Sequence, residues 1–196
     1  MVLGITGKSG AGKHTAAEFL RQKGWVILDA DRIAHFLYRP YTHVWKAVTK
    51  KFGEDILGSA DIIDRQKLGR IVFDESPKGK KALEDLNAIL HPAIRHYFTK
   101  ELHFLRRKEK TMVAVVAALW EETGLPEFCE KILLITSNEA VAFERIRKRD
   151  GINEAAYRSR ISRQSVPPRA DFIVENNGAF ADFYQALNIL KIGEKA

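Results

Sequence analysis

The chain has 196 residues, of which 45% are hydrophobic and 29% charged, proportions that are ordinary for one soluble globular domain. A single cysteine, Cys129, excludes an intramolecular disulfide, and no apolar run is long enough to cross a bilayer. The net charge of +7 favours anionic partners, either nucleic acid or small phosphorylated ligands. Because a short apolar segment and glycines follow Met1, with no basic signal-peptide region, we expect a cytoplasmic protein.

The first 28 residues predict a strand, a glycine-rich turn, a helix and a second strand. The apolar run Val2–Thr6 is typical of a buried strand, and the helix after the turn is expected to end at Gly24. Trp25–Leu28 then forms the second strand. Such a βαβ unit implies a right-handed crossover between two parallel strands.

From about residue 33 to residue 110 the pattern is mostly helical. Apolar residues recur three and four apart in residues 42–52 and 81–105, and Pro92 is expected to kink or break the second segment. Asp64 is placed to cap a short helix that runs to Phe73. These features predict a helical insert after the second strand.

The rest of the chain alternates strands and helices. Further strands are expected at Met112–Leu119, at Lys131–Thr136 and within residues 170–176, with two basic helices before the last strand and one closing helix after it. Alternation of this kind predicts an α/β fold with a doubly wound parallel sheet. In such folds ligands bind at the carboxyl ends of the strands, beside which the helical insert would lie.

The segment GKSGAGKHT, Gly7–Thr15, matches a phosphate-binding loop at Gly7, Gly12 and Lys13. It lies between a predicted strand and a predicted helix, where this motif belongs. Backbone N–H groups and the helix N-terminus would face the phosphates, and the Lys13 ammonium would add a positive charge. The alternative is an incidental glycine-rich turn.

His14 occupies the position at which a phosphate loop normally supplies a Ser or Thr hydroxyl to Mg²⁺. Imidazole suits softer metals better than Mg²⁺, which prefers oxygen ligands. Thr15 lies about 100° further round the helix, so it is no obvious replacement. We therefore expect phosphate binding with an altered metal position, or else Mg²⁺ held by water and substrate phosphates alone.

Two carboxylates, Asp29 and Asp31, follow the second predicted strand directly and should lie at the carboxyl edge of the sheet. Phosphoryl transfer to a hydroxyl needs a carboxylate that orients the hydroxyl and accepts its proton, and Asp31 is the candidate for this role. Alternatively, one aspartate caps the helix that begins near Arg32.

Nine segments together resemble the dephospho-CoA kinase family over nearly the whole chain. They are LGITGKSGAGKHT, VILDADRIAHFL, FGEDIL, IDRQKLGRIVF, LNAILHPAIR, EETGL, RIRKRDG, RISRQ and ADFIVENNG. The resemblance implies a single P-loop kinase domain over residues 1–196, with a parallel β-sheet flanked by helices. It also implies a helical CoA-binding insert at about 33–110, a lid at about 141–165, and transfer of the ATP γ-phosphate to the ribose 3′-hydroxyl of dephospho-CoA, the last step of coenzyme A biosynthesis.

The resemblance further implies which residues contact the substrates. The residues implied to hold ATP come from the phosphate loop and the end of the last strand: Gly10, Ala11, Gly12, Lys13, His14, Thr15 and Asn176. Those implied to act on the transferring phosphoryl and the acceptor are Lys13, Asp31, Arg145, Arg149, His91 and Arg95. Without the resemblance, the two later arginines would be assigned to a solvated helix face, and His91 to a helix end before proline.

Two departures from the family pattern concern the metal. His14 replaces the usual Ser, and Val115 occupies a position on the third strand that is acidic in the family. Glu121 falls where the family also has a glutamate, so it does not replace the missing carboxylate. We expect ATP with Mg²⁺ as the phosphate donor, and the metal ligands are unknown. The alternative is a nucleotide- or CoA-binding homologue with weak or lost catalysis.

The sequence has no zinc-ligand spacing and no aromatic RNA-binding signature, so we expect no nucleic-acid partner. The oligomeric state stays open.

Overall fold

The computed structural model describes residues 1–108, 111–118, 120, 123–167 and 169–192. The chain divides into two compact units. The first unit comprises Met1–Ala30 and His103–Ala196, and the second comprises Asp31–Leu102. Among the described residues, no helix is both long and apolar enough to span a membrane.

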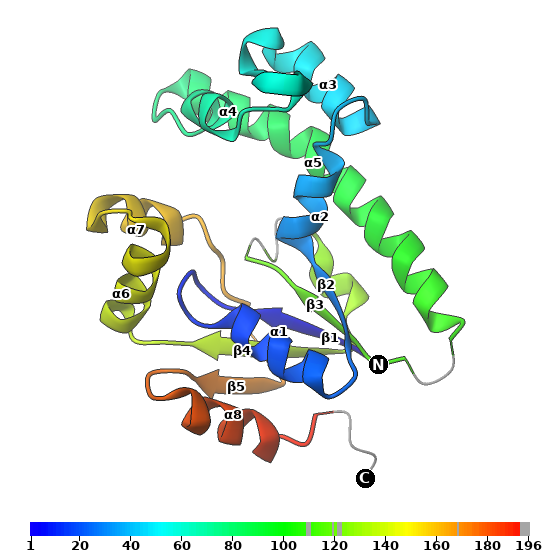
Figure 1. The fold of residues 1–196 in the computed structure, drawn as a ribbon, viewed down its shortest axis with the longest axis vertical. Coiled ribbons are helices and arrows are strands. Elements are labelled where there is room, and N and C mark those ends of the chain that lie inside the picture. The colour runs from blue at the N-terminus through cyan, green and yellow to red at the C-terminus, as the bar shows by residue number, and fades with distance from the viewer. Residues whose placement is uncertain (109–110, 119, 121–122, 168, 193–196) are drawn as a thin grey trace. The chain divides into compact units, whose positions relative to one another are not determined.

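The first unit is built on a five-stranded sheet in which every strand pairs in parallel with its neighbours, in the order β2-β3-β1-β4-β5 (Figure 1). The strands are β1 Val2–Thr6, β2 Val26–Asp29, β3 Val113–Val116, β4 Lys131–Thr136 and β5 Phe172–Glu175. The parallel α/β sheet predicted from the sequence is confirmed. The third strand is shorter than expected, and the predicted end at Leu119 lies outside the described residues.

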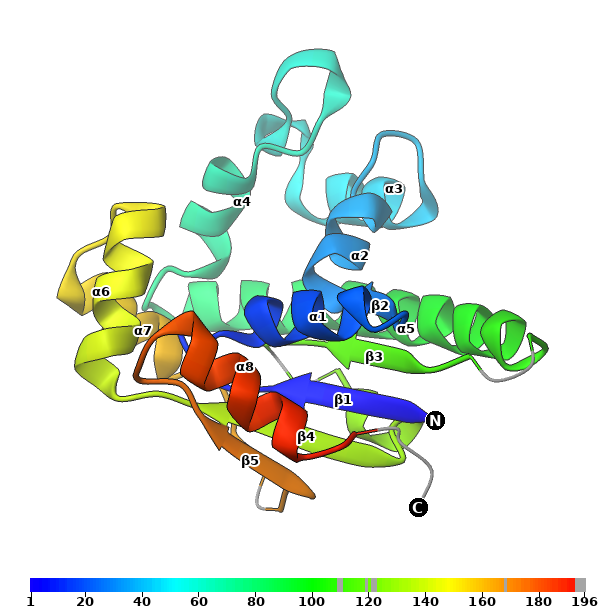
Figure 2. The same ribbon diagram turned by 60° about the horizontal axis from the view of Figure 1, so that its bottom comes forward.

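One face of the sheet is covered by helices α1, Lys13–Gln22, and α8, Phe180–Ile189 (Figure 2). Apolar side chains of both helices join buried side chains of β1, β3, β4 and β5 in one core. Burial of such side chains contributes about 1.5–3 kcal/mol for each large one, and it fixes which way α1 leaves the glycine-rich turn. On the opposite face, Gly4 leaves room for the indole of Trp120, since a Cβ there would collide with the ring.

Two basic helices, α6 Glu139–Asp150 and α7 Glu154–Ile161, follow β4 and pack against each other through a small apolar cluster. Asn138 caps α6 at its start, and Gly151, with a left-handed φ of 68°, ends it. A short 3₁₀ helix, η3 Leu125–Phe128, precedes β4. Burial raises the pKa of the neighbouring Cys129 thiol to about 12, so this cysteine is not a reactive thiolate at neutral pH.

The second unit is helical. Its elements are α2 Ala30–Leu37, α3 His43–Phe52, η1 Glu54–Ile56, η2 Ser59–Asp61, α4 Arg65–Val72 and α5 Pro77–Arg106, of which α2 begins and α5 ends in the first unit. The predicted cap is confirmed, because the Asp64 carboxylate accepts hydrogen bonds from the N–H groups of Gln66 and Lys67 at 2.8 and 3.2 Å.

Helix α5 continues through Pro92, so of the two predicted outcomes, a kink or a break, the break is wrong. Proline removes one main-chain hydrogen bond and crowds the preceding turn. The helix persists because its apolar side chains on both sides of Pro92 are buried, among them Leu86, Ile94 and Phe98. Burial of three large side chains offsets a cost of about 3 kcal/mol.

Candidate functional site

The loop between β1 and α1 has a backbone that only glycine fits well at three positions. Gly7, Gly10 and Gly12 have φ values of 145°, 87° and 109°. A Cβ at these positions would collide with the carbonyl oxygens of Ile135 and Ala142 and with the side-chain amide of Asn176, respectively. The glycines therefore allow both the left-handed turns and the close packing of the loop against neighbouring elements.

Lys13 begins helix α1 and is only 6% exposed. Its ammonium donates hydrogen bonds to the carbonyl oxygens of Gly7, at 2.6 Å, and Lys8, at 3.2 Å. A buried ammonium needs such partners because losing its hydration is costly. The loop thus wraps round a fixed positive charge at the N-terminus of a helix, which is the arrangement that binds phosphate.

Asn176, which directly follows β5, holds the loop from one side. Its side-chain N–H donates to the carbonyl of Ala11 at 2.8 Å, and the residue is 7% exposed. Because the C=O and N–H of one trans peptide point in opposite directions, this bond turns the N–H of Gly12 away from Asn176. The loop keeps that N–H on the side from which an anion could approach.

Arg145 on α6 holds the loop from a second element. Its guanidinium donates to the backbone carbonyls of Gly10, at 3.3 Å, and Asn176, at 2.8 Å, and to the Asn176 side-chain oxygen at 3.3 Å. It also reaches the Ser137 hydroxyl at 3.5 Å. The planar fork of the guanidinium suits several acceptors at once. Three predicted site elements, namely the loop, Arg145 and Asn176, are thus brought together.

A second clamp on the loop was not predicted from the sequence. The Gln164 side chain accepts from the N–H of Ser9 at 2.8 Å and donates to the Ser9 hydroxyl at 3.0 Å. The Tyr157 hydroxyl donates to the Ser9 carbonyl at 3.5 Å. Gln164 lies in RISRQ, a segment that carries the family resemblance, but nothing in a single sequence reveals a partner 155 residues away.

His14, the second residue of α1, contacts the carboxylate that ends β2. Its Nε2 lies 2.9 Å from Oδ2 of Asp29 in a hydrogen bond. The imidazole side chain is 59% exposed, whereas the Asp29 side chain is 9% exposed.

The next residue, Thr15, is half-buried on α1. Val115 is fully buried on β3, in register with Gly4 of β1 and Leu28 of β2, and Glu121 lies outside the described residues.

Arg149 lies one helical turn after Arg145 on α6, so the two side chains share a face of the helix. Its guanidinium donates to both carboxylate oxygens of Asp150, at 2.7 and 3.0 Å. These bonds, with a further one from Arg160, hold the pKa of the Asp150 carboxyl well below its usual range. Arg149 is therefore positioned by a permanent anion at ordinary pH.

The predicted acceptor-side residues belong to the second unit. Asp31 lies in the first turn of α2, which begins at Ala30, slightly before the expected start near Arg32. His91 and Arg95 lie one turn apart within α5, on the same face of the helix. Because α5 continues past His91, the assignment of this histidine to a helix end is wrong.

Comparison with known proteins identifies the family. A sequence model described as dephospho-CoA kinase matches residues 1–182. The chain belongs to the dephospho-CoA kinase family. It is 35% identical to a dephospho-CoA kinase of Fusobacterium nucleatum over 94% of each chain, and 34% identical to one of Geobacillus kaustophilus over 97% of this chain and 96% of the relative.

Solved structures agree with the family assignment. A dephospho-CoA kinase of Campylobacter jejuni is 28% identical, with a TM-score of 0.69 and coverage of 98% of this chain and 96% of that one. A protein of Thermus thermophilus is 26% identical, with a TM-score of 0.78 and coverage of 100% and 98%. The predicted P-loop kinase fold is therefore confirmed. As a member of this family the chain is an ATP-dependent kinase, and nothing found favours the alternative of a homologue that has lost catalysis.

Proposed function

We propose that this chain transfers the γ-phosphoryl group of ATP to the ribose 3′-hydroxyl of dephospho-CoA. The observation that supports this most strongly is the phosphate loop closed round Lys13, in a chain that matches the dephospho-CoA kinase family over residues 1–182. Small phosphorylated substrates also account for the net charge of +7 without a nucleic-acid partner. From the same family match we also propose a cytoplasmic location.

On the ATP side, Gly10, Gly12 and Lys13 would present backbone N–H groups to the phosphates, together with His14 and Thr15 at the start of α1. The N–H of Ala11 donates to the Lys8 carbonyl at 3.1 Å, so Ala11 would contribute by shaping the loop. The Lys13 ammonium would exchange its bond to the Gly7 or Lys8 carbonyl for a phosphate oxygen. Asn176 would act chiefly by holding the Ala11 carbonyl, and as the residue after β5 it would also lie near the adenine.

On the acceptor side, Asp31 would orient the ribose hydroxyl. As the bond between the acceptor oxygen and the γ-phosphorus forms, the bond from phosphorus to the ADP oxygen breaks, and the hydroxyl proton passes to the Asp31 carboxylate. His91 and Arg95, one turn apart on α5, would contact the CoA moiety, with Arg95 suited to its phosphates. The helical insert expected at about 33–110 would then be the CoA-binding part of the chain.

The basic segment at about 141–165 would be the lid. Arg145 and Arg149 share one face of α6 and would neutralise charge on the transferring phosphoryl. Arg145 already contacts the loop through Gly10, so it needs little movement to reach a phosphate there. The Gln164 clamp on Ser9 would couple the end of this segment to the loop.

A divalent cation, when bound, would shield the β- and γ-phosphates and so lower the cost of bringing the acceptor oxygen to phosphorus. Mg²⁺ prefers oxygen ligands at an octahedral site. The imidazole of His14, which is hydrogen-bonded to the Asp29 carboxylate, fits softer ions than Mg²⁺. Phosphate and water oxygens would supply the remaining ligands.

The test is a transfer assay with purified chain, ATP and dephospho-CoA, in which ADP and CoA are both quantified. We expect equal amounts of the two products and no reaction when dephospho-CoA is replaced by CoA, whose 3′-hydroxyl is already phosphorylated. Lys13→Ala should reduce both products to background, because the loop then lacks its charge. ADP formed without CoA, or CoA formed equally well by the variant, would overturn the proposal.

A further inference from the structure

We infer that His14 is the protein ligand of the nucleotide-bound divalent cation and that Asp29 orients it, so that this chain favours Mn²⁺ over Mg²⁺. This rests on the proposed function, since it concerns the cation that accompanies the nucleotide. It departs from the Ser or Thr hydroxyl that a phosphate loop ordinarily offers at this position.

The geometry of the pair is that of an oriented metal-binding histidine. One ring nitrogen, Nε2, is bonded to the Asp29 carboxylate at 2.9 Å. The other, Nδ1, makes no hydrogen bond with any residue that the structure describes, and 59% of the side chain is exposed. Histidines that bind metals almost always donate their second ring N–H to a carboxylate, carbonyl or water, which fixes the ring and raises the basicity of the ligating nitrogen.

The position of His14 puts this ring at the end of α1 that borders the phosphate loop. It directly follows Lys13, whose ammonium sits among the loop carbonyls, and it lies in the first turn of α1. Within the described ranges, no three or more histidine, cysteine or acidic side chains gather as a metal site. The cation would therefore take most of its ligands from phosphate and water oxygens and bind together with the nucleotide rather than before it.

The ligand type decides the preferred cation. Mg²⁺ binds imidazole poorly and requires near-ideal octahedral oxygen coordination. Mn²⁺ also takes mostly oxygen ligands, but unlike Mg²⁺ it belongs to the first-row series, in which affinity for a nitrogen-containing site rises from Mn²⁺ to Cu²⁺. Replacing one hydroxyl by an imidazole should thus favour Mn²⁺ relative to Mg²⁺, without requiring any change in the phosphate contacts.

The decisive measurement is the modulation of the electron spin echo of Mn²⁺ bound with ADP to the full chain. This modulation detects a nitrogen nucleus that is coordinated to the ion. We expect an imidazole nitrogen signal in the original chain that changes when ¹⁵N-labelled histidine is incorporated. The labelling separates a histidine ligand from an adenine nitrogen. His14→Ser and His14→Asn should both lose the signal while keeping the circular dichroism of the folded chain.

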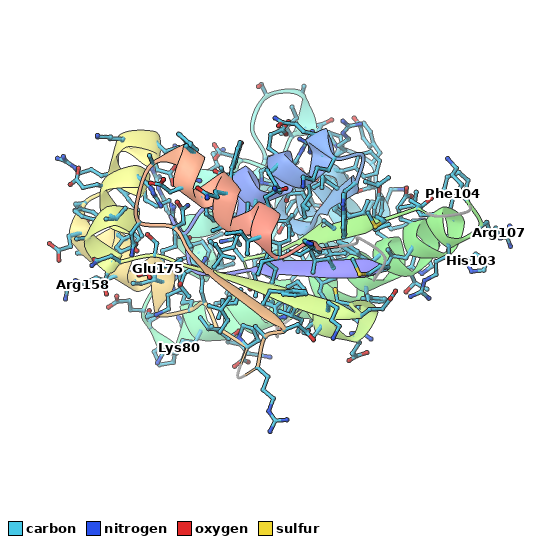
Figure 3. The ribbon with its side chains drawn as sticks, turned by 90° about the horizontal axis from the view of Figure 1, so that it is seen from below. Lys80, His103, Phe104, Arg107, Arg158 and Glu175 are labelled. Atoms are coloured by element: carbon cyan, nitrogen blue, oxygen red, sulfur yellow. The ribbon has the colours of Figure 1, made fainter. Side chains whose placement is uncertain are left out.

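His103→Ser is the matched control, because His103 is an exposed histidine in the last turn of α5, as Figure 3 shows. It should leave the signal unchanged. Asp29→Asn should keep the nitrogen signal but weaken Mn²⁺ binding in the presence of ADP by about 10–100-fold, the usual effect of losing such a partner. A nitrogen modulation of the echo that is the same in the original chain and in both His14 variants would overturn the inference.

A second measurement compares cations directly. ADP affinity measured calorimetrically with Mn²⁺ and with Mg²⁺ should give a ratio that falls by roughly 10-fold or more on His14→Ser, by loss of a nitrogen ligand. An unchanged ratio would contradict the preference. Neither readout needs phosphoryl transfer, so a nitrogen signal in a chain that forms no CoA would overturn the proposed function alone, and transfer without the signal would overturn this inference alone.

Discussion

Replacing Asn176 with alanine should loosen the phosphate loop as a whole rather than remove a contact with adenine alone. The side-chain N–H of Asn176 donates to the Ala11 carbonyl at 2.8 Å, and both residues are buried. The side-chain oxygen accepts a longer bond of 3.3 Å from Arg145. In Asn176→Ala both partners lose these bonds, and the Ala11 carbonyl is left in a cavity that the amide had filled.

The size of the effect follows from burial. Leaving a buried acceptor without a partner costs about 1–3 kcal/mol, and the longer bond from the guanidinium adds a smaller amount, so the free energy of unfolding should fall by about 2–3 kcal/mol. Asn177→Ala is a suitable control. Its side chain accepts from the Asn138 N–H and the Ser137 hydroxyl and donates to Glu175, all in exposed positions and none to the loop, so its loss should cost about 1 kcal/mol or less.

Two measurements separate a loop brace from an adenine contact. Urea unfolding of the free chain should show the loss of stability in Asn176→Ala. Calorimetric titration should then show that affinity falls by a similar factor for ATP and for inorganic triphosphate, which has no adenine. A variant that keeps its stability and its triphosphate affinity while losing ATP affinity would refute the brace and favour the adenine contact.

Three further changes test other parts of the site and fold. Asp31→Asn should lower kcat by about two to four orders of magnitude with little change in ATP affinity, and an intact kcat with reduced stability would instead support a capping role. Gln164→Ala should weaken ATP binding by roughly 5–10-fold in calorimetry because Ser9 loses both side-chain bonds, and unchanged affinity would show that this clamp does not hold the loop. Ala60→Gly should raise the free energy of unfolding by about 0.5–1 kcal/mol, because Ala60 has a left-handed φ of 55°, and a lower urea midpoint would contradict this.

Much of the fold follows from local patterns. The buried strands are continuous apolar runs in the sequence. Particular residues mark helix ends, such as Asp64 at the start of α4 and Gly151 at the end of α6. The predicted break at Pro92 does not occur, because a local rule about proline does not include the burial of the side chains that hold α5 together on both sides. The local sequence therefore indicates the free energy that proline costs a helix, whereas tertiary packing decides whether buried side chains offset it.

The site divides in the same way. The glycines and Lys13 are recognisable because a phosphate loop needs them at fixed spacing. The loop's supports are not, since Arg145 and Gln164 reach it across more than 130 residues through backbone carbonyls and a serine, which any sequence contains. The sequence shows that His14 departs from the motif. It does not show the hydrogen bond to Asp29, because that bond depends on how the end of β2 lies beside α1.

The most direct test of the central claim is phosphorus NMR of the product formed from dephospho-CoA and ATP. The account predicts one new phosphomonoester resonance, coupled to the ribose H3′ proton, appearing at the rate at which ADP forms and absent with Lys13→Ala. A resonance coupled to a proton at any other position would contradict the assigned acceptor. Release of inorganic phosphate with no new ester would contradict the assignment of this chain as a dephospho-CoA phosphotransferase.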